Sequence, residues 1–360
     1  MNHSPTQAPH LWLRSETKTG EHRAPLTPEG ARALLQNGFR VSVESMPSRV
    51  FSDRAYTDAG CELVEAGSWP QAPKQAWILG LKELPDEPLA LGHHHIYFAH
   101  AFKGQESAMR TLTRFKNGKG MLLDLEYVTE SNGRRVAAFG YWAGYVGAAL
   151  SLLGWAHGIT RSSFRHIEAF ENQAALDLFV DEQVSAATKT SKRRPAGMVI
   201  GALGRSGGGA CDCLHRHGVK TTPWDVKETA TGGPFSDILK HELFINCVLL
   251  SKRTKPFITP TDLACESPLR IICDVSCDPN HPFNPIPIYD QLTSFEQPLQ
   301  PITGSKVSVI SIDNLPALLP KESSEDFASQ LLPHLRTLPQ STAPWIASQS
   351  KYLESISAQL

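Results

Sequence analysis

The chain has 360 residues, of which 41% are hydrophobic and 20% are charged, and its formal net charge at pH 7 is -1. A chain of this length is expected to form two domains, and its balanced charge argues against nucleic acid or a membrane surface as a partner. The seven cysteines are odd in number and form no Cys-x-x-Cys pair, which indicates free thiols in a reducing compartment. Residues 1–9 lack an apolar stretch, so no secretory signal is expected.

Strands alternate with helices in the first third of the predicted structure. We expect strands at 9–15, 40–45, 76–82, 95–101 and 120–128, and helices at 27–39, 52–61 and 105–118. Thr27 is the expected N-cap of the first helix, with Pro28 at its first position and Gly38 at its end. This alternation is typical of an α/β fold with a parallel, doubly wound sheet.

Residues 136–160 contain no Asp, Glu, Lys or Arg. The segment is long enough to cross a bilayer, and Gly140 and Gly144 form a GxxxG pattern. We favour the alternative of a long helix buried between two domains, because the segment is rich in glycine and alanine and contains His157. Its glycines would then allow another backbone to approach closely.

A second α/β unit begins at Met198 with a strand that leads into Gly201, Gly204 and Gly207. This G-x-x-G-x-x-G turn before a helix is a relaxed dinucleotide-binding pattern, although a glycine-rich turn without a ligand is an alternative. Glycine allows a tight turn and a close approach to a pyrophosphate, which the helix N-terminus can bind. Asp225 ends the next strand, 18 residues after Gly207, and its carboxylate would accept from ribose hydroxyls and repel a 2′-phosphate. The unit therefore predicts NAD as the cofactor.

Cations and histidines follow several expected strands in the first half of the chain. Those after the first, third and fourth strands are Arg14, Lys18, Arg23, Lys82 and His100. Glu126 lies in the last expected strand, and Arg134 and Arg135 precede the long uncharged segment. In open α/β sheets, ligands bind beyond the carboxyl ends of the strands, where arginine suits carboxylates and lysine with a lowered pKa suits proton transfer. Each residue alone could be a surface charge, but their shared placement predicts a substrate site.

No metal site is expected. His93 to His95 are adjacent, so on a strand their side chains alternate between two faces and cannot converge on one ion. His215 and His217 are two residues apart on an expected helix, which does not place them on one face.

A family resemblance rests on motifs that run in order along nearly the whole chain. They are RSETKTGEHRAPLTPEG, GLKELP, FAHAFKGQ, GRRVAAFG, GALGRSGGGA, WDVKET, RIICDVSCD, NPIPIY and VISIDNLPALLP. Together they closely resemble the NAD-dependent, L-lysine-forming saccharopine dehydrogenases. The opening motif and the lysine of GLKELP are shared with alanine dehydrogenase and the related transhydrogenase domain, so alanine dehydrogenase is the alternative within the superfamily.

The resemblance implies two Rossmann-like domains with a cleft between them. Residues 1–137 with 322–360 would bind saccharopine, and residues 138–321 would bind NAD. The implied reaction is the NAD-dependent cleavage of saccharopine, through an imine, to lysine and 2-oxoglutarate. A related enzyme acting on another amine and keto acid, or an idle nucleotide-binding relative, are the alternatives. The presence of both Lys82 and His100 favours a working enzyme.

Residue by residue, the resemblance implies Lys82 and His100 as the acid–base groups, with Glu126 and Lys18 as charged neighbours of the lysine. The implied substrate contacts are Arg23, Lys18, Gln105, Arg135, Phe139, Ser276, Cys277 and Asp278. The implied cofactor contacts are Arg134, Gly204, Arg205, Asp225, Thr229, Leu249, Val275, Ile312, Asp313, Asn314 and Leu315. The sequence departs from the family's usual residues at Ser206, Leu249 and Asn314.

The expected partners are small molecules only, namely saccharopine, lysine and 2-oxoglutarate, and the chain is expected to act as a monomer. The C-terminal Ala-Gln-Leu resembles a peroxisomal tripeptide but lacks its central basic residue, so a cytoplasmic location is expected.

Overall fold

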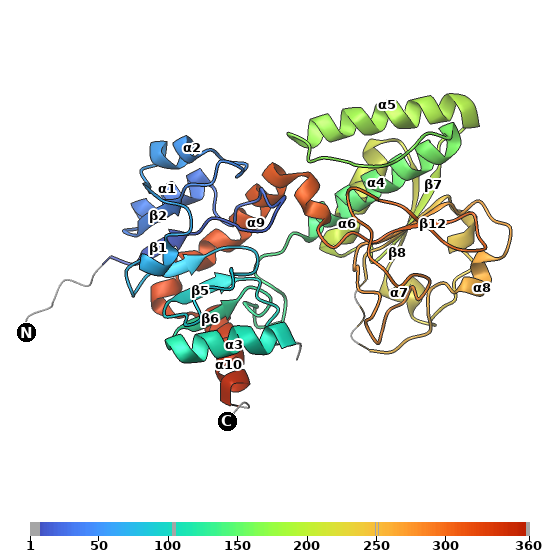
Figure 1. Cartoon of the computed structure of the whole chain (residues 1–360). Coiled ribbons are helices and arrows are strands. Elements are labelled where there is room, and N and C mark those ends of the chain that lie inside the picture. The colour runs from blue at the N-terminus through green and yellow to red at the C-terminus, as the bar shows by residue number, and fades with distance from the viewer. Residues whose placement is uncertain (1–7, 103–105, 249, 251, 358–360) are drawn as a thin grey trace, which may run out of the picture. The chain divides into compact units, whose positions relative to one another are not determined.

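A computed structural model describes residues 8–102, 106–248, 250 and 252–357 (Figure 1). The chain divides into two compact units: unit 1 is Met1–Ala138 with Ser323–Leu360, and unit 2 is Phe139–Glu322. Each unit contains a six-stranded sheet, parallel throughout in unit 1 and parallel except for one edge strand in unit 2. The prediction of an α/β fold with two parallel sheets is confirmed. Gln105, Leu249 and the C-terminal tripeptide lie outside the described residues.

The sheet of unit 1 has the strand order β3-β2-β1-β4-β5-β6, which is the doubly wound order that reverses between its first and fourth strands. Its elements are β1 (His10–Leu13), α1 (Pro28–Gln36), β2 (Arg40–Glu44), α2 (Asp53–Asp58), β3 (Glu62–Val64), η1 (Trp69–Gln71), β4 (Trp77–Leu79), β5 (His94–Tyr97), α3 (Glu106–Gly118) and β6 (Met121–Asp124).

Local chemistry explains the first helix. The hydroxyl of Thr27 accepts the N–H of Gly30 at 3.0 Å, Pro28 occupies the first helical position, and Gly38 follows the helix with a φ of +82°. A side chain at that φ would strain the backbone, so glycine ends the helix without cost. The predicted caps of α1 are confirmed.

All five strands predicted for unit 1 are shorter than expected, and three of them end three or four residues early. The β4 strand ends at Leu79, so Lys82 follows it by three residues, and β5 ends at Tyr97. The β6 strand ends at Asp124, because the Asp124 side chain accepts the N–H of Glu126 at 3.0 Å and its carbonyl accepts that of Tyr127 at 2.9 Å. The placement of Glu126 inside a strand was therefore wrong, since it lies in this turn. The β3 strand was not predicted; it has three residues, of which two are exposed.

The C-terminal helices α9 (Pro320–Leu335) and α10 (Ala343–Ser357), joined by η4 (Leu338–Gln340), lie beside the sheet of unit 1, red against blue and cyan in Figure 1. In α9 the hydroxyl of Ser324 accepts the N–H of Ala24 at 2.9 Å. In α10, Tyr352 donates to the carbonyl of Gly120 at 3.0 Å and Ser348 to that of Asp124 at 3.1 Å. The end of the chain therefore supports loops on the first sheet.

The sheet of unit 2 has the order β11-β12-β10-β9-β7-β8, with β11 antiparallel at the edge. Its elements are α4 (Gly140–Thr160), α5 (Gln173–Ser191), β7 (Ala196–Ile200), α6 (Arg205–Arg216), β8 (Lys220–Trp224), α7 (Val226–Thr229), η2 (Ile238–Lys240), β9 (Leu243–Asn246), α8 (Pro260–Leu263), β10 (Ile271–Asp274), β11 (Gln300–Pro301), β12 (Ser308–Ile310) and η3 (Leu315–Leu318).

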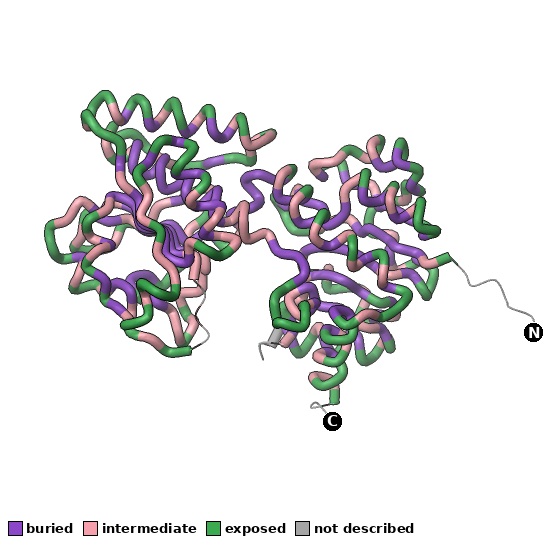
Figure 2. Tube along the Cα trace, turned by 180° about the vertical axis from the view of Figure 1, so that it is seen from behind, coloured by how far each residue is buried: buried purple, intermediate pink, exposed green. Residues whose placement is uncertain are grey.

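The uncharged helix α4 lies in the core of unit 2, packed against α5, α6 and the sheet, so its expected position between two domains was wrong. Its glycines allow this packing: a Cβ on Gly144 would overlap the carbonyl of Ser206, and one on Gly209 of α6 would overlap that of Tyr141. Among the described residues, no helix is long and apolar enough to cross a membrane. Figure 2 shows the central strands of both sheets as buried and the outer faces of the helices as exposed, whereas the edge strands β3 and β8 contain no buried residue.

Candidate active site

Four strand ends of unit 1 carry most of the predicted substrate-site residues. The register aligns Leu13 of β1 with Leu79 of β4, Leu79 with Ile96 of β5, and Ile96 with Leu123 of β6. The loops that leave these strands therefore begin at one edge of the sheet, the carboxyl edge. This edge includes the reversal of strand order between β1 and β4, where doubly wound sheets bind ligands.

The loop after β1 carries a buried ion pair between Glu21 and Arg23. Nε and Nη2 of Arg23 donate to the two carboxylate oxygens at 2.8 and 2.6 Å, and both residues are nearly inaccessible to solvent. Burial alone would raise the pKa of the Glu21 carboxyl, but the hydrogen bonds and charge of Arg23 and the charge of Lys82 lower it below its usual value. The carboxylate of Glu21 thus binds the predicted anchor Arg23 and is also within reach of the charge of the predicted proton carrier Lys82. Sequence reasoning did not include Glu21 in the site.

A second carboxylate, Glu126, connects the other predicted groups. Its Oε2 lies 3.5 Å from Nδ1 of His100, and its Oε1 lies 3.6 Å from Nη1 of Arg135. The side chains of His100 and Arg135 are 44% and 45% exposed, so both can meet a ligand. His100 has a φ of +50°, a left-handed conformation that non-glycine residues rarely adopt and that is frequent at functional sites. Its ring stacks on that of Phe98, with 6.5 Å between the two ring centroids.

Beneath this cluster lies the buried Asp124, also missed from the sequence. Its Oδ1 accepts the N–H of Glu126, and its Oδ2 is buried without a hydrogen-bond partner among the described residues. Burial raises the pKa of Asp124 to about 6, with the charge of Glu126 also raising it and the N–H of Glu126 and the charge of His100 opposing. This carboxyl can therefore titrate just below neutral pH.

The remaining predicted substrate contacts are distributed over both units. Lys18 is exposed in the turn after β1, where its carbonyl accepts the N–H of Glu21 at 3.1 Å. Phe139 precedes α4 and belongs to unit 2, as do Ser276, Cys277 and Asp278, which follow β10. The hydroxyl of Ser276 donates to Asp274 at 2.6 Å, and Cys277 has a φ of +54°.

The glycine turn of unit 2 leads from β7 into α6. Gly201 has a φ of +90°, and Gly204 is the N-cap of the helix. A Cβ on Gly207 would overlap the carbonyl of Gly201, so the third glycine lets the first helical turn pack directly on the strand end. The first turn of α6 contains no acidic residue. Unpaired N–H groups at the start of such a helix suit a pyrophosphate.

Asp225 follows β8 and faces the glycine turn. Its Oδ2 accepts the N–H of Leu203 and its Oδ1 that of Val226, each at 2.8 Å. It also caps α7 in a reciprocal arrangement with Glu228, and its carbonyl accepts the hydroxyl of Thr229 at 2.9 Å. The carboxylate is therefore fixed beside the turn, where its remaining lone pairs can accept ribose hydroxyls.

The other predicted cofactor contacts lie mainly at strand ends of unit 2. Arg205 opens α6 and Val275 follows β10, while Ile312 to Leu315 follow β12 and lead into η3. Asp313 is exposed and Leu315 is buried. Arg134 differs, because it belongs to unit 1 and is exposed beside Arg135.

No group of three or more His, Cys, Asp or Glu side chains in the described part of the chain could hold a metal ion. His93 and His95 are buried whereas His94 is exposed, as strand alternation requires. His217 is instead buried beside two carboxylates, with Nδ1 2.8 Å from Asp181 and Nε2 3.4 Å from Asp177.

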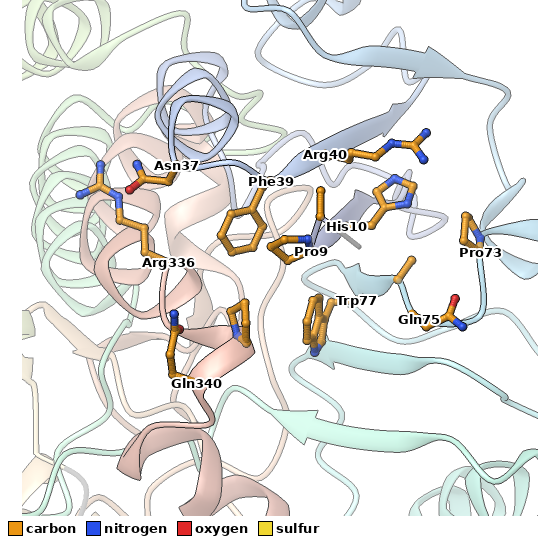
Figure 3. A pocket seen from close by; sticks show the side chains of 13 residues that line it. Pro9, His10, Asn37, Phe39, Arg40, Pro73, Gln75, Trp77, Arg336 and Gln340 are labelled. Carbon is orange, nitrogen blue, oxygen red and sulfur yellow. The ribbon is translucent and has the colours of Figure 1, made fainter. Parts of the chain in front are cut away.

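A pocket of about 580 Å³ lies at the other edge of the sheet in unit 1 (Figure 3). His10, Arg40 and Trp77, which begin β1, β2 and β4, line it together with residues of η4 such as Gln340. Because the predicted acid–base groups follow the carboxyl ends of the strands, this pocket is not part of the candidate active site.

Comparison with known proteins adds evidence that is independent of this geometry. Residues 12–146 match the family model described as alanine dehydrogenase/PNT, N-terminal domain. The chain is 45% identical to the NAD(+), L-lysine-forming saccharopine dehydrogenase of Schizosaccharomyces pombe, over 96% of this chain and 98% of the relative. It is 44% identical to the enzyme of the same name from Yarrowia lipolytica, over 95% and 96% of the two chains.

The chain belongs to the saccharopine dehydrogenase family. Among solved structures, an L-alanine dehydrogenase is similar with a TM-score of 0.66 and 16% identity, covering 96% of this chain and 93% of that one. At this identity the likeness concerns the fold alone, and it agrees with two α/β units. Membership of the saccharopine dehydrogenase family confirms the resemblance found from the motifs, while the roles of individual residues stay predictions.

Proposed function

We propose that this protein catalyses the NAD+-dependent cleavage of L-saccharopine to L-lysine and 2-oxoglutarate, a step of lysine biosynthesis. The observation that carries the proposal is the 45% identity, over nearly the whole of both chains, to a relative that is named for this activity. In balanced form, saccharopine, NAD+ and water give lysine, 2-oxoglutarate, NADH and a proton. Bound NAD+ supplies the acceptor for the hydride that leaves the glutamyl α-carbon.

The carboxyl edge of unit 1 holds the groups that the proton transfers require. The secondary amine must lose a proton, water must add to the imine, and the departing lysine nitrogen must gain a proton. Lys82 and His100 are the proposed carriers, because both follow strands that end at this edge. His100 lies 3.5 Å from Glu126, and the charge of Lys82 acts on Glu21. A carboxylate favours the protonated form of a nearby base, so these acids would make both carriers hold their protons more strongly.

Saccharopine carries three carboxylates, and the same edge provides guanidinium groups for them. Arg135 is half-exposed and Arg23 is buried in its pair with Glu21. A substrate carboxylate at Arg23 must use donors other than Nε and Nη2, which Glu21 already occupies. Arg135 is therefore the simpler anchor, and Arg23 would act together with its partner.

Unit 2 is the proposed NAD-binding unit, with the pyrophosphate at the N-terminus of α6 and the adenosine ribose at Asp225. The glycine turn and the fixed carboxylate support this assignment, because they supply N–H donors and an acceptor at the spacing that a dinucleotide requires. Unit 1 is correspondingly the proposed substrate-binding unit.

The direct test is to incubate the purified chain with saccharopine and NAD+, follow NADH absorbance, and identify lysine and 2-oxoglutarate by mass spectrometry. Alanine with NAD+, and 2-oxoglutarate with NADH and a panel of amines, are the comparison reactions. Turnover of alanine in place of saccharopine would favour the alanine dehydrogenase-like alternative. Binding of NADH without turnover of any substrate would indicate an idle relative.

We further propose that the enzyme is a cytoplasmic monomer. Light scattering after size exclusion tests the oligomeric state, and a fluorescent fusion with and without the C-terminal tripeptide tests the location.

A further inference from the structure

The backbone of Lys82 lies where the hydrogen-bond ladder of the sheet ends. The N–H of Gly80 still donates to the carbonyl of Ile96 at 2.9 Å, and the carbonyl of Leu81 accepts the N–H of Phe98 at 3.1 Å. The N–H groups of Leu81 and Lys82 point instead toward the loop after β1. Main-chain donors in a buried region need other acceptors, or folding becomes costly.

Glu16 supplies both acceptors. Its Oε1 accepts the N–H of Leu81 at 2.7 Å, and its Oε2 accepts the N–H of Lys82 at 3.0 Å. Two bonds from one carboxylate to consecutive amides fix the orientation of the peptide plane between them. The side chain of Glu16 is 2% exposed, so water does not compete for these bonds.

Arg14 completes the contact from the other side. Its Nη2 donates to the carbonyl of Lys82, and its Nη1 lies 3.2 Å from Oε2 of Glu16. Both main-chain polar groups of Lys82 are therefore bound by the two members of one buried ion pair. A guanidinium suits this position because its planar fork can bind a carbonyl and a carboxylate at the same time.

Two further residues, Gly80 and Glu44, determine the position of the Arg14–Glu16 pair. A Cβ on Gly80 would overlap the guanidinium of Arg14, so glycine at this position leaves the space that the arginine occupies just after β4. Glu44 of β2 accepts both the N–H and the hydroxyl of Ser15 at 2.8 Å, which holds the segment between the two charged residues. The pair is thus held from both sides of β1: from β2 through Ser15, and from the residues that follow β4.

We propose that Arg14 and Glu16 are positioning residues that fix the backbone of Lys82, so that its amine reaches the reacting nitrogen of the substrate in one orientation. This inference rests on the proposed function, because it assigns the pair a role in that reaction. Neither residue needs to contact the substrate. Small displacements of a reacting group cost rate rather than binding.

The first test compares Glu16→Gln and Arg14→Lys with wild type in saccharopine oxidation. The glutamine offers one acceptor oxygen for two amides, and the lysine keeps the charge but loses the fork. We expect kcat to fall roughly 10- to 100-fold in each variant, while KM for NAD+ stays unchanged. Arg14→Lys should lose less than Arg14→Met. Gly80→Ala, which displaces the guanidinium without removing a charge, should reproduce the loss in kcat.

A control distinguishes positioning from loss of a charge pair. Arg40 and Glu62 form an exposed ion pair at 3.6 Å on the same sheet, so Glu62→Gln should leave kcat unchanged. In a Lys82→Met background, Glu16→Gln should cause no further loss, because a positioning residue acts only through the group that it holds. A further loss in that background, with thermal unfolding unchanged, would overturn the proposal.

Hydrogen exchange of the full chain makes the proposal testable without turnover. Mass spectrometry should find faster exchange of the amides of Leu81 and Lys82 in Glu16→Gln, and no change in Glu62→Gln. Unchanged exchange in Glu16→Gln would overturn the positioning role even in an active enzyme. A wild-type chain that exchanges as expected but does not oxidise saccharopine would instead refute the proposed function.

Discussion

The carboxylate of Glu21 binds Arg23 through three donors: Nε at 2.8 Å, Nη2 at 2.6 Å and the main-chain N–H at 3.0 Å. Both side chains are almost completely buried, and the charge of Lys82 acts on the same carboxylate. The predicted substrate anchor is thus half of an internal ion pair, and its removal should affect both stability and substrate binding.

Arg23→Ala should lower the free energy of unfolding of unit 1 by about 3–5 kcal/mol, because it leaves the Glu21 carboxylate buried and unpaired. It should also raise KM for 2-oxoglutarate about 10- to 100-fold through the loss of a charge-assisted bond. Denaturant unfolding and kinetics of the reverse reaction measure the two effects. Arg135→Ala should raise KM to a similar degree with little loss of stability, because Arg135 is half-exposed.

The control for this prediction is Arg54→Ala, which breaks an exposed ion pair with Asp58 and should cost about 0–1 kcal/mol. Unchanged KM in both Arg23→Ala and Arg135→Ala would remove these arginines from the substrate site.

Asp124→Asn should stabilise unit 1 at pH 7 by about 1–3 kcal/mol, since burial of the charged carboxyl is unfavourable. Burial raises the pKa of Asp124 to about 6, so the folded state keeps a proton that the unfolded state releases at lower pH. The contribution of the Asp124 carboxyl to the stability of the wild type is therefore complete below about pH 4, and it is lost as the pH rises through about 6. Unfolding free energies of both proteins across this range should diverge with rising pH. Parallel curves would show that Asp124 does not titrate there.

Lys82→Met should lower kcat roughly 10²- to 10⁴-fold, because the methionine cannot carry a proton. NADH binding should persist, and one limb of the pH–rate profile should flatten. His100→Gln should remove the other limb, and the double variant should lose less than the product of the single losses if the two groups share a proton path. A near-normal kcat with an unaltered pH profile in Lys82→Met would leave this lysine as a structural charge.

Asp225→Ser should narrow the preference for NADH over NADPH, because it removes the carboxylate that would repel a 2′-phosphate. Serine can still cap α7, so the fold of the turn should survive. Asp225→Ala removes the cap as well, and the comparison separates the two effects. The measurement is kcat/KM for the two cofactors, and equal use of NADPH by the wild type would contradict the assignment.

Gly144→Ala should destabilise unit 2 by about 1–3 kcal/mol, because the added methyl group overlaps the carbonyl of Ser206 where α4 meets α6. Gly158 is the matched control in the same helix: it is exposed and nothing lies within 4 Å of its Cβ position. Gly158→Ala should instead stabilise the helix by about 0.5–1 kcal/mol through the better helix propensity of alanine. Equal effects of the two substitutions on thermal unfolding would contradict the close packing of α4 on α6.

Local sequence signals predicted much of this fold correctly. The caps of α1 follow from Thr27, Pro28 and Gly38, since each acts through its own backbone or its nearest neighbours. The glycine turn after β7 and the carboxylate of Asp225 were also visible as a spaced pattern. The family, in turn, could be identified from motifs distributed along the chain.

Strand ends were predicted less well, because they depend on contacts that are distant in the sequence. The apolar run that includes β4 continues to Leu81, but the strand ends at Leu79. The amides of Leu81 and Lys82 donate instead to Glu16, 65 and 66 residues earlier in the sequence. The β6 strand ends at Asp124, whose side chain accepts the N–H of Glu126 in the following turn. An aspartate within a run of hydrophobic residues did not predict this turn.

The sequence by itself determined which residues could do chemistry. Lys82, His100, Arg23 and Asp225 are visible as charged or titratable groups that follow strands, and Arg135 as one that precedes the long uncharged segment. Only the tertiary structure decided how they are held, through the acids Glu16, Glu21 and Asp124. An acidic side chain reads as a surface charge in a sequence, because burial and partners are absent from it. When parallel strands bring their carboxyl ends to one edge of the sheet, these carboxylates become buried and lose their water. They must then bind cations or main-chain amides, and these bonds fix the positions of the residues in the candidate site.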